Sequence, residues 1–184
     1  MTLTLTTARL TLRPPVPADL DHLVAGIGNY AVAKFLTPVP HPYGHADGEA
    51  WLGTVPAAPT LGDAVFAIDL GEAGFIGCVG YQSELGYWIA EPFWGRGIVT
   101  EAARAVLDWA FESGAAEPLL CGAHIDNAAS MRVQEKLGFA VTHTSRVFAR
   151  ARQQEIERFH TVVTRAGLQA ACAQLDAPTG SGKK

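Results

Sequence analysis

The sequence predicts a mixed α/β fold, and two features of its pattern predict it. Short strand-like runs precede a long amphipathic helix in the middle of the chain, and a strand, a helix and a strand pair follow that helix. Of the 184 residues, 48% are hydrophobic and 17% are charged, so the chain can bury a substantial core. We expect one domain over residues 1–176 and a flexible tail of small and polar residues at 177–184.

The N-terminal part of the chain is expected to hold one short strand and several helical segments. Leu10 and Leu12 alternate with Thr11 and Arg13, as in a strand, and two prolines end the run. Beyond the prolines, apolar residues recur at helical spacing between glycine and proline residues. The expected elements are a strand at 8–13, helical segments at 17–27, 29–36 and 46–52, and a loop at 37–45.

The middle of the chain consists of short apolar runs at 64–70, 75–81 and 84–89. Their connections are short and rich in turn residues, so we expect antiparallel hairpins. A loop at 90–97 then opens a helix that ends near Glu112, with one apolar and one polar stripe.

The last third of the chain predicts further strands and one helix. The long helix joins the strand at 84–89 to a strand at 119–125, and a helical crossover makes such strands parallel. A helix and a closing pair of strands follow. These elements are expected at 127–137, 140–149 and 157–164.

Composition argues against several classes of protein. A net charge of −4 does not favour a broad nucleic-acid surface. No apolar run reaches the ~18 residues that a membrane span needs, and residues 1–13 do not look like a secretory signal. The three cysteines, at 78, 121 and 172, show no metal-binding spacing and fit a reducing compartment. We therefore expect a cytoplasmic protein without a metal, membrane or nucleic-acid partner.

Residues 94–100 (WGRGIVT) form a candidate phosphate-binding segment, because they follow a strand and open a helix. Gly95 and Gly97 allow successive N–H groups to converge, and the first N–H groups of a helix have no internal partner. A diphosphate would satisfy them, with Arg96 adding charge and Thr100 a hydroxyl donor. The spacing matches neither a P-loop nor a dinucleotide fingerprint. Taken alone, the segment is equally compatible with an ordinary turn before a helix.

Several short motifs occur in a fixed order between residues 8 and 166. They are ARLTLRP at 8–14, PY at 42–43 with EAWL at 49–52, GFIG at 74–77, ELGYWI at 84–89 with FWGRG at 93–97 and TEA at 100–102, and NAAS at 127–130 with EKLGF at 135–139. Together they resemble the GNAT N-acetyltransferase superfamily, and in particular its RimJ/RimL-like branch. Each motif is weak alone, and their shared order and spacing make the resemblance specific.

The resemblance implies a mostly antiparallel central sheet flanked by helices. It also implies that this sheet splays between its fourth and fifth strands, at 84–89 and 119–125, and that acetyl-CoA lies in the gap. Backbone groups at the end of the fourth strand would pair with the pantetheine arm, and the following loop would hold the pyrophosphate. The implied cofactor-binding residues are Trp88, Ile89, Ala90, Trp94, Gly95, Arg96, Gly97, Ile98, Val99, Thr100, Asn127 and Ser130.

The last helix departs from the family pattern at the position of the general acid. Many members carry a tyrosine where this chain has Gln134, so Ser130 is the candidate to hydrogen-bond the leaving thiolate or relay a proton. Ser130 lies on an inward stripe with Val133 and Leu137. The alternative is a helix-start serine that bonds the backbone, and Asn127 has the corresponding alternative of a helix N-cap.

Glu84 is the candidate general base. It lies on the same strand face as Trp88, and a carboxylate beside an aromatic ring in a cleft can have a raised pKa. An exposed strand-end glutamate is the alternative reading of Glu84. His41 and Tyr43, in the loop that covers the acceptor in the family, and His124 at a strand end are candidates for acceptor binding.

The sequence therefore favours an acetyl-CoA-dependent N-acetyltransferase in which a primary amine attacks the thioester directly. The acceptor would be a protein N-terminal α-amine or a small-molecule amine. A non-catalytic acyl-CoA sensor and a nucleotide-binding enzyme that uses the Gly-Arg-Gly loop remain as alternatives. A homodimer is suggested by the family resemblance alone.

Overall fold

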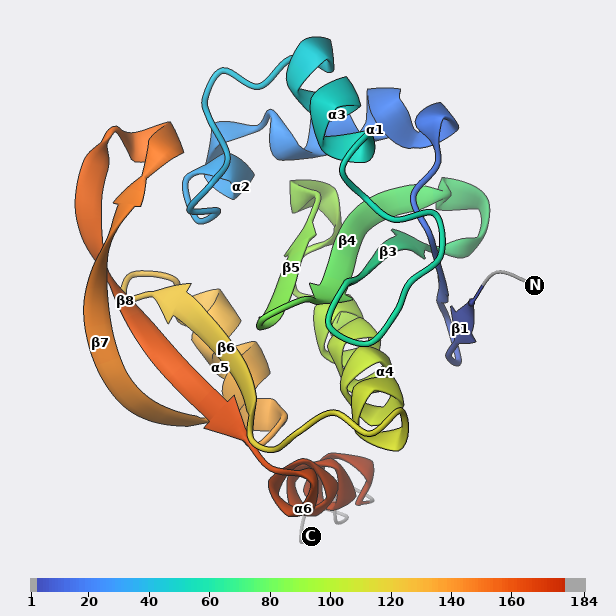
Figure 1. Cartoon of the computed structure of the whole chain (residues 1–184), viewed down its shortest axis with the longest axis vertical. Helices are drawn as coiled ribbons and strands as arrows, with labels where there is room; N and C mark the ends of the chain where they lie inside the picture. The colour runs from blue at the N-terminus through green and yellow to red at the C-terminus, as the bar shows by residue number, and fades with distance from the viewer. Residues whose placement is uncertain (1–2, 178–184) are drawn as a thin grey trace, which may run out of the picture.

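The computed structural model describes residues 3–177, and most of the expected tail at 177–184 lies outside them. Its centre is an eight-stranded sheet with the order β1-β2-β3-β4-β5-β6-β8-β7 (Figure 1). All neighbouring strands are antiparallel except β5 and β6, which are parallel as the helical crossover predicts. The strands are β1 Leu5–Thr6, β2 Thr11–Arg13, β3 Ala64–Asp69, β4 Phe75–Tyr81, β5 Leu85–Ile89, β6 Leu119–His124, β7 Ala140–Ala149 and β8 Gln154–Val163.

Helices cover both faces of the sheet. The three N-terminal helices cover a smaller core that includes Val32, Cys78 and Trp88, and the three C-terminal helices belong to the larger core around α4. The first group is α1 Leu20–Ile27, α2 Tyr30–Ala33 and α3 His45–Leu52, and the second is α4 Ile98–Glu112, α5 Ala128–Lys136 and α6 Arg165–Asp176. Short 3-10 turns lie at η1 Pro17–Asp19, η2 Gly71–Ala73, η3 Glu91–Phe93 and η4 Arg150–Arg152. None of the helices in residues 3–177 has the length and apolar composition that crossing a membrane requires.

The predicted mixed fold is confirmed, although α2 is shorter than the helical segment expected at 29–36 and β8 begins three residues before the expected strand at 157–164. The largest differences lie toward the two ends of the chain. The strand expected at 8–13 is shorter, and a separate strand, β1, precedes it. The helix α6 was not expected, because only Leu168 and Cys172 of this amphipathic segment are buried and its apolar stripe is correspondingly thin.

The sheet opens between β5 and β6. Leu85 and Cys121 are the register partners that join these two strands, and toward Ile89 the strands separate. Figure 1 shows β5 and β6 diverging, with α5 behind β6. The splay implied for the strands at 84–89 and 119–125 is thus present, and it leaves the backbone of β5 accessible from the gap.

The hairpin of β7 and β8 closes one end of this gap. Its η4 turn is tied to the loop after α2, since Arg150 N–H donates to the Thr37 carbonyl at 3.1 Å. Arg152 Nε also donates to the Lys34 carbonyl at 2.7 Å and pairs with Asp126. These contacts bring chain segments more than a hundred residues apart to the same wall of the gap.

Candidate active site

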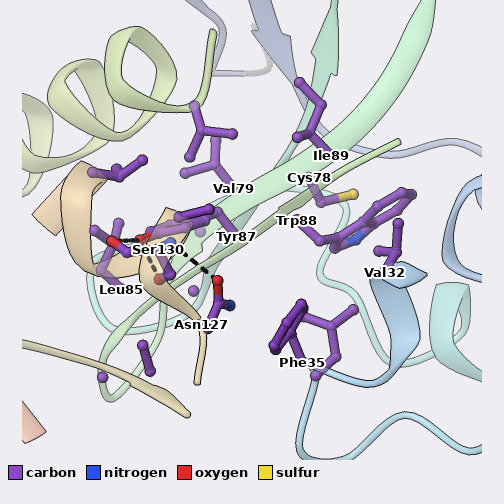
Figure 2. A pocket seen from close by; sticks show the side chains of 18 of the residues that line it. Val32, Phe35, Cys78, Val79, Leu85, Tyr87, Trp88, Ile89, Asn127 and Ser130 are labelled. Atoms are coloured by element: carbon purple, nitrogen blue, oxygen red, sulfur yellow. Dashed lines mark hydrogen bonds between the residues drawn. The ribbon is translucent and has the colours of Figure 1, made fainter. Parts of the chain in front are cut away.

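A cleft of about 880 Å³ runs through the gap between β5 and β6. It is lined by the loop 94–100, by β5, by α5 and by the loop that follows α2. Figure 2 shows Ser130 and Asn127 on one side of β5, and Val32, Phe35 and Trp88 on the other. The cleft therefore connects the predicted phosphate-binding segment with the predicted catalytic residues.

The loop before α4 has the backbone geometry that an anion site needs. Gly95 and Gly97 have φ values of 74° and 72°, in the left-handed region that favours glycine. Gly97 is the N-cap of α4, so the free N–H groups of the first helical turn point out of the loop. Arg96 is exposed, and its guanidinium lies 5.4 Å from the centre of the Phe93 ring. Free N–H groups and an exposed arginine are what a diphosphate needs, and its binding at this loop stays a prediction.

Arg9 holds this loop in place, and sequence reasoning did not single it out. Its Nη1 donates to the Arg96 carbonyl at 3.1 Å, and its Nε donates to Glu101 in the first turn of α4 at 2.7 Å. Burial opposes ionisation of Glu101, but hydrogen bonds from Thr7 and Arg9 outweigh it and lower the pKa of that carboxyl. Arg9 thus links the N-terminal segment to both sides of the glycine turn.

The backbone of β5 presents a different set of groups to the gap than the resemblance implied. Ala90 N–H donates to the Ile76 carbonyl of β4 at 2.9 Å. By strand alternation Trp88 also directs its backbone groups toward β4, whereas Tyr87 and Ile89 direct theirs into the gap. The indole of Trp94 donates to the Ile89 carbonyl at 2.8 Å. Of the residues expected to pair with pantetheine, only Ile89 therefore has its backbone directed into the gap.

Ser130 is the centre of a polar network at the start of α5. The residue is 9% exposed and lines the cleft. Its hydroxyl lies 2.8 Å from the Tyr87 hydroxyl and accepts a hydrogen bond from Gln134 Nε2 at 3.1 Å. Gln134 is oriented in turn by Thr161, whose hydroxyl donates to Gln134 Oε1 at 2.6 Å. Asn127 caps the helix by accepting from Ser130 N–H at 3.1 Å, and it also lines the cleft.

Tyr87 was missed at the level of sequence. Burial raises the pKa of its phenol well above the usual range, so the hydroxyl stays protonated near neutral pH. Strand alternation alone places Tyr87 opposite Trp88 but does not identify what it faces. The splayed sheet brings the Tyr87 hydroxyl of β5 against α5, at Ser130 one turn before Gln134.

Glu84 lies immediately before β5 and lines the cleft, as does Trp88. Its carboxylate is not isolated beside the aromatic ring, because Arg158 Nη2 of β8 donates to its Oε1 at 2.5 Å. The guanidinium of Arg158 lies across Gly122, where an added Cβ would approach Arg158 Cζ to 2.6 Å. Arg158 therefore fixes the position of the Glu84 carboxylate in the cleft. The sequence did not predict this arginine.

The expected acceptor-binding residues divide into two groups. His124 lines the cleft, is 1% exposed and has its Nε2 2.9 Å from the Thr37 hydroxyl. Burial, with repulsion from Arg152, lowers the pKa of His124 to about 4, so its imidazole is neutral at pH 7. His41 and Tyr43 are not among the described residues that line the cleft. His41 is exposed and lies 5.0 Å from the Tyr30 ring, and Tyr43 packs on the core under α1.

Comparison with known proteins relates this arrangement to an acetyltransferase family. A family model described as an acetyltransferase (GNAT) domain matches residues 9–140. The "Putative ribosomal N-acetyltransferase YdaF" of Bacillus subtilis (strain 168) is 39% identical over 61 residues, which are 33% of this chain and 33% of that protein. The similarity to this curated relative thus spans about a third of its length.

Solved structures share the fold at low sequence identity. An acetyltransferase (GNAT family) from Bacillus anthracis superposes with a TM-score of 0.74 at 17% identity, covering 88% of this chain and 98% of that chain. The Microcin C7 self immunity acetyltransferase MccE, in complex with acetyl-CoA and AMP, superposes with a TM-score of 0.67 at 15% identity, covering 85% and 94%. Because the family model spans most of the sequence, the chain belongs to the GNAT acetyltransferase family.

Proposed function

We propose that this protein is an acetyl-CoA-dependent N-acetyltransferase that acts on a primary amine by direct attack. The observation that carries the proposal is the single cleft that joins the glycine turn at 95–97 to the Ser130–Tyr87 pair and to Glu84. The acetyl-CoA bound to the structural neighbour MccE supports the same donor for this chain.

The donor would lie with its phosphates on the loop before α4 and its thioester beside Ser130. The N–H groups after Gly97 and the side chain of Arg96 would bind phosphate. Arg132 and Lys136 of α5 are exposed, line the same cleft and would add positive charge. The pantetheine arm would follow the gap-facing edge of β5, where Ile89 N–H is directed.

Transfer requires a neutral amine, a polarised carbonyl and a stabilised leaving thiolate. Glu84 would take the proton that the amine loses, directly or through a water molecule, while the nitrogen forms its bond to the acetyl carbon. The C–S bond breaks, and the thiolate would receive a hydrogen bond from Ser130. Bulk water then supplies the proton that converts the thiolate to free thiol.

The hydrogen bonds around Ser130 favour an orientation in which its hydroxyl hydrogen points toward the thiolate. Gln134 Oε1 accepts from Thr161, so the amide nitrogen of Gln134 faces Ser130 and donates to its oxygen. The Tyr87 hydroxyl lies 2.8 Å from the Ser130 hydroxyl and 3.3 Å from the Ser130 carbonyl, and as a neutral phenol it would donate to the remaining lone pair of the closer hydroxyl. The hydrogen of Ser130 is then left to point into the cleft, toward the site proposed for sulfur. Tyr87 would orient this donor without giving up its own proton.

An acetyl-transfer assay read by mass spectrometry tests the proposal. The purified chain and acetyl-CoA would be offered peptides with a free N-terminus and small primary amines. We expect a mass gain of one acetyl group, abolished by omitting the protein and strongly reduced in Ser130→Ala. The name of the relative YdaF supports a peptide N-terminal amine as the first class to test.

A non-catalytic acyl-CoA sensor is the second candidate, favoured by Gln134 in place of the helix tyrosine. It predicts that acetyl-CoA raises the melting temperature of the protein while no amine in the panel is acetylated. A cytoplasmic location stays a prediction from the cysteine pattern and the N-terminal sequence, and a homodimer stays a prediction of the family resemblance. Light scattering after size-exclusion chromatography would test the dimer, and elution as a monomer would contradict it.

A further inference from the structure

The cleft has two chemically different walls, one on each side of β5. The wall formed by the loop 94–100 and α5 is polar and holds Arg96, Arg132 and Lys136. The opposite wall is formed by apolar side chains from α2 and its following loop, from α3 and from β3 to β5. These side chains are Val32, Phe35, Leu36, Trp51, Val65 and Trp88.

The apolar wall consists of side chains that packing holds in place. Val32 is 4% and Trp88 9% exposed, and both pack in the core cluster under α1 to α3. Phe35 lies with its ring centre 5.1 Å from the guanidinium of Arg152, which holds the ring at this wall. Figure 2 shows Val32, Phe35 and Trp88 gathered on one side of the cleft. The wall lies across β5 from Ser130, where an acceptor would approach the thioester.

The charges around the cleft restrict what this wall can accept. Within residues 3–177, Glu84 is the acidic side chain that lines the cleft, and Arg158 already pairs with it. The other charged lining residues are Arg96, Arg132 and Lys136, all positive. An acceptor with several ammonium groups would have to bury charges that lack carboxylate partners, which is strongly unfavourable. The mild net negative charge of the chain, −4, is thus not located at the cleft.

From these walls we infer that the acceptor carries a single primary amine next to an apolar, preferably aromatic, group. The amine would lie near Glu84, and the apolar group would fill the compartment of Phe35, Trp51 and Trp88. This chemistry fits a peptide whose first residue is large and apolar, or a free arylalkylamine, and it excludes polyamines and aminoglycosides. The inference rests on the proposed transfer function and names the substrate class for that same site.

A matched set of acceptors tests the inference with the full chain. The set comprises two tetrapeptides that differ only in a first residue of Phe or Gly, 2-phenylethylamine, and spermidine. We expect kcat/KM for the Phe peptide or for 2-phenylethylamine to exceed that for the Gly peptide and spermidine by at least about tenfold, because the added ring leaves water. Comparing the two aromatic compounds distinguishes a peptide acceptor from a free amine.

Two single-residue variants test whether the preference for an aromatic acceptor arises at the apolar wall. Phe35→Ala should lower kcat/KM for the favoured aromatic acceptor about tenfold more than for the Gly peptide, because it removes one side of the compartment. Phe148→Ala is the control, because Phe148 is 52% exposed on β7 and is not among the lining residues. If Phe35→Ala does not fold, as judged by its melting temperature with acetyl-CoA, Trp51→Leu replaces it.

Two outcomes overturn the inference in distinguishable ways. Preferred acetylation of spermidine, or a kcat/KM for both aromatic compounds no higher than that for the Gly peptide, would refute the acceptor class and leave the transfer function standing. Absence of acetylation across the set, with acetyl-CoA still raising the melting temperature, would refute the transfer function and with it the acceptor class.

Discussion

The hydroxyl of Tyr87 on β5 lies 2.8 Å from the hydroxyl of Ser130 on α5. These residues come from elements on the two sides of the splay, and Gln134 completes the contact from one turn further along the helix. The pair belongs to a buried polar network with Gln134 and Thr161, directly beside the cleft. It also places a phenol within one helical turn of Gln134.

Replacing Tyr87 by Phe should lower kcat about 10-fold and leave the KM for acetyl-CoA nearly unchanged. The phenol orients the hydroxyl of Ser130, and misorienting a donor to the developing thiolate costs transition-state binding. Steady-state kinetics at saturating acceptor measure the change. Tyr30→Phe serves as the control, because Tyr30 is 47% exposed and does not line the cleft. An unaltered kcat in Tyr87→Phe would remove this residue from the mechanism.

Glu84→Gln should lower the rate most at low pH and leave the affinity for acetyl-CoA nearly unchanged. At high pH a larger share of the acceptor amine is already neutral, so the loss of a general base matters less there. A pH–rate profile of the variant beside the parent protein measures this. Glu112→Gln, at the exposed end of α4, is the matched control. A parallel reduction at every pH would argue against a role as base.

Arg9→Met should raise the dissociation constant of acetyl-CoA about 3- to 10-fold with little change in kcat. The change removes the hydrogen bond to the Arg96 carbonyl and the ion pair with Glu101, so the glycine turn loses its support. Isothermal titration calorimetry measures the constant. Arg146→Met on β7 controls for the loss of a positive charge, because the Arg146 side chain is 74% exposed. Equal effects of both substitutions would mean that Arg9 acts only through net charge.

The neutral buried His124 should make the protein less stable in acid. Its pKa is about 4 in the folded protein, below the ordinary value of 6.5. As the pH falls, His124 is therefore protonated in the unfolded chain before it is protonated in the folded protein. The free energy of unfolding that neutral His124 contributes above about pH 6.5 is lost between pH 6.5 and 4. We expect a loss of about 1–3 kcal/mol from this residue.

Urea unfolding at pH 4.5, 5.5 and 7.5 tests the His124 prediction. His124→Gln removes the titrating group and should flatten the dependence of the unfolding free energy on pH. His22→Gln, at an exposed position on α1, should retain the slope of the parent protein. The same slope in His124→Gln and the parent would assign the acid sensitivity to other groups.

Local patterns in the sequence were sufficient for much of the fold. Hydrophobic periodicity predicted the middle strands and α4 within a few residues, because each such element repeats its pattern over several turns or alternations. Glycine spacing before a helix similarly predicted the turn at Gly95 and Gly97, whose positive φ values are a property of the local backbone.

The sequence by itself determined the order of the strands and helices between β2 and β8, the glycine turn, and the positions of Ser130 and Glu84 within the family motifs. Only the tertiary structure decided what these residues contact. Tyr87 meets Ser130 across 43 residues of sequence, Arg158 meets Glu84 across 74, and Arg9 meets Glu101 across 92. Such contacts depend on strand register and on the splay of the sheet, which arise from packing of the whole chain rather than from any local period.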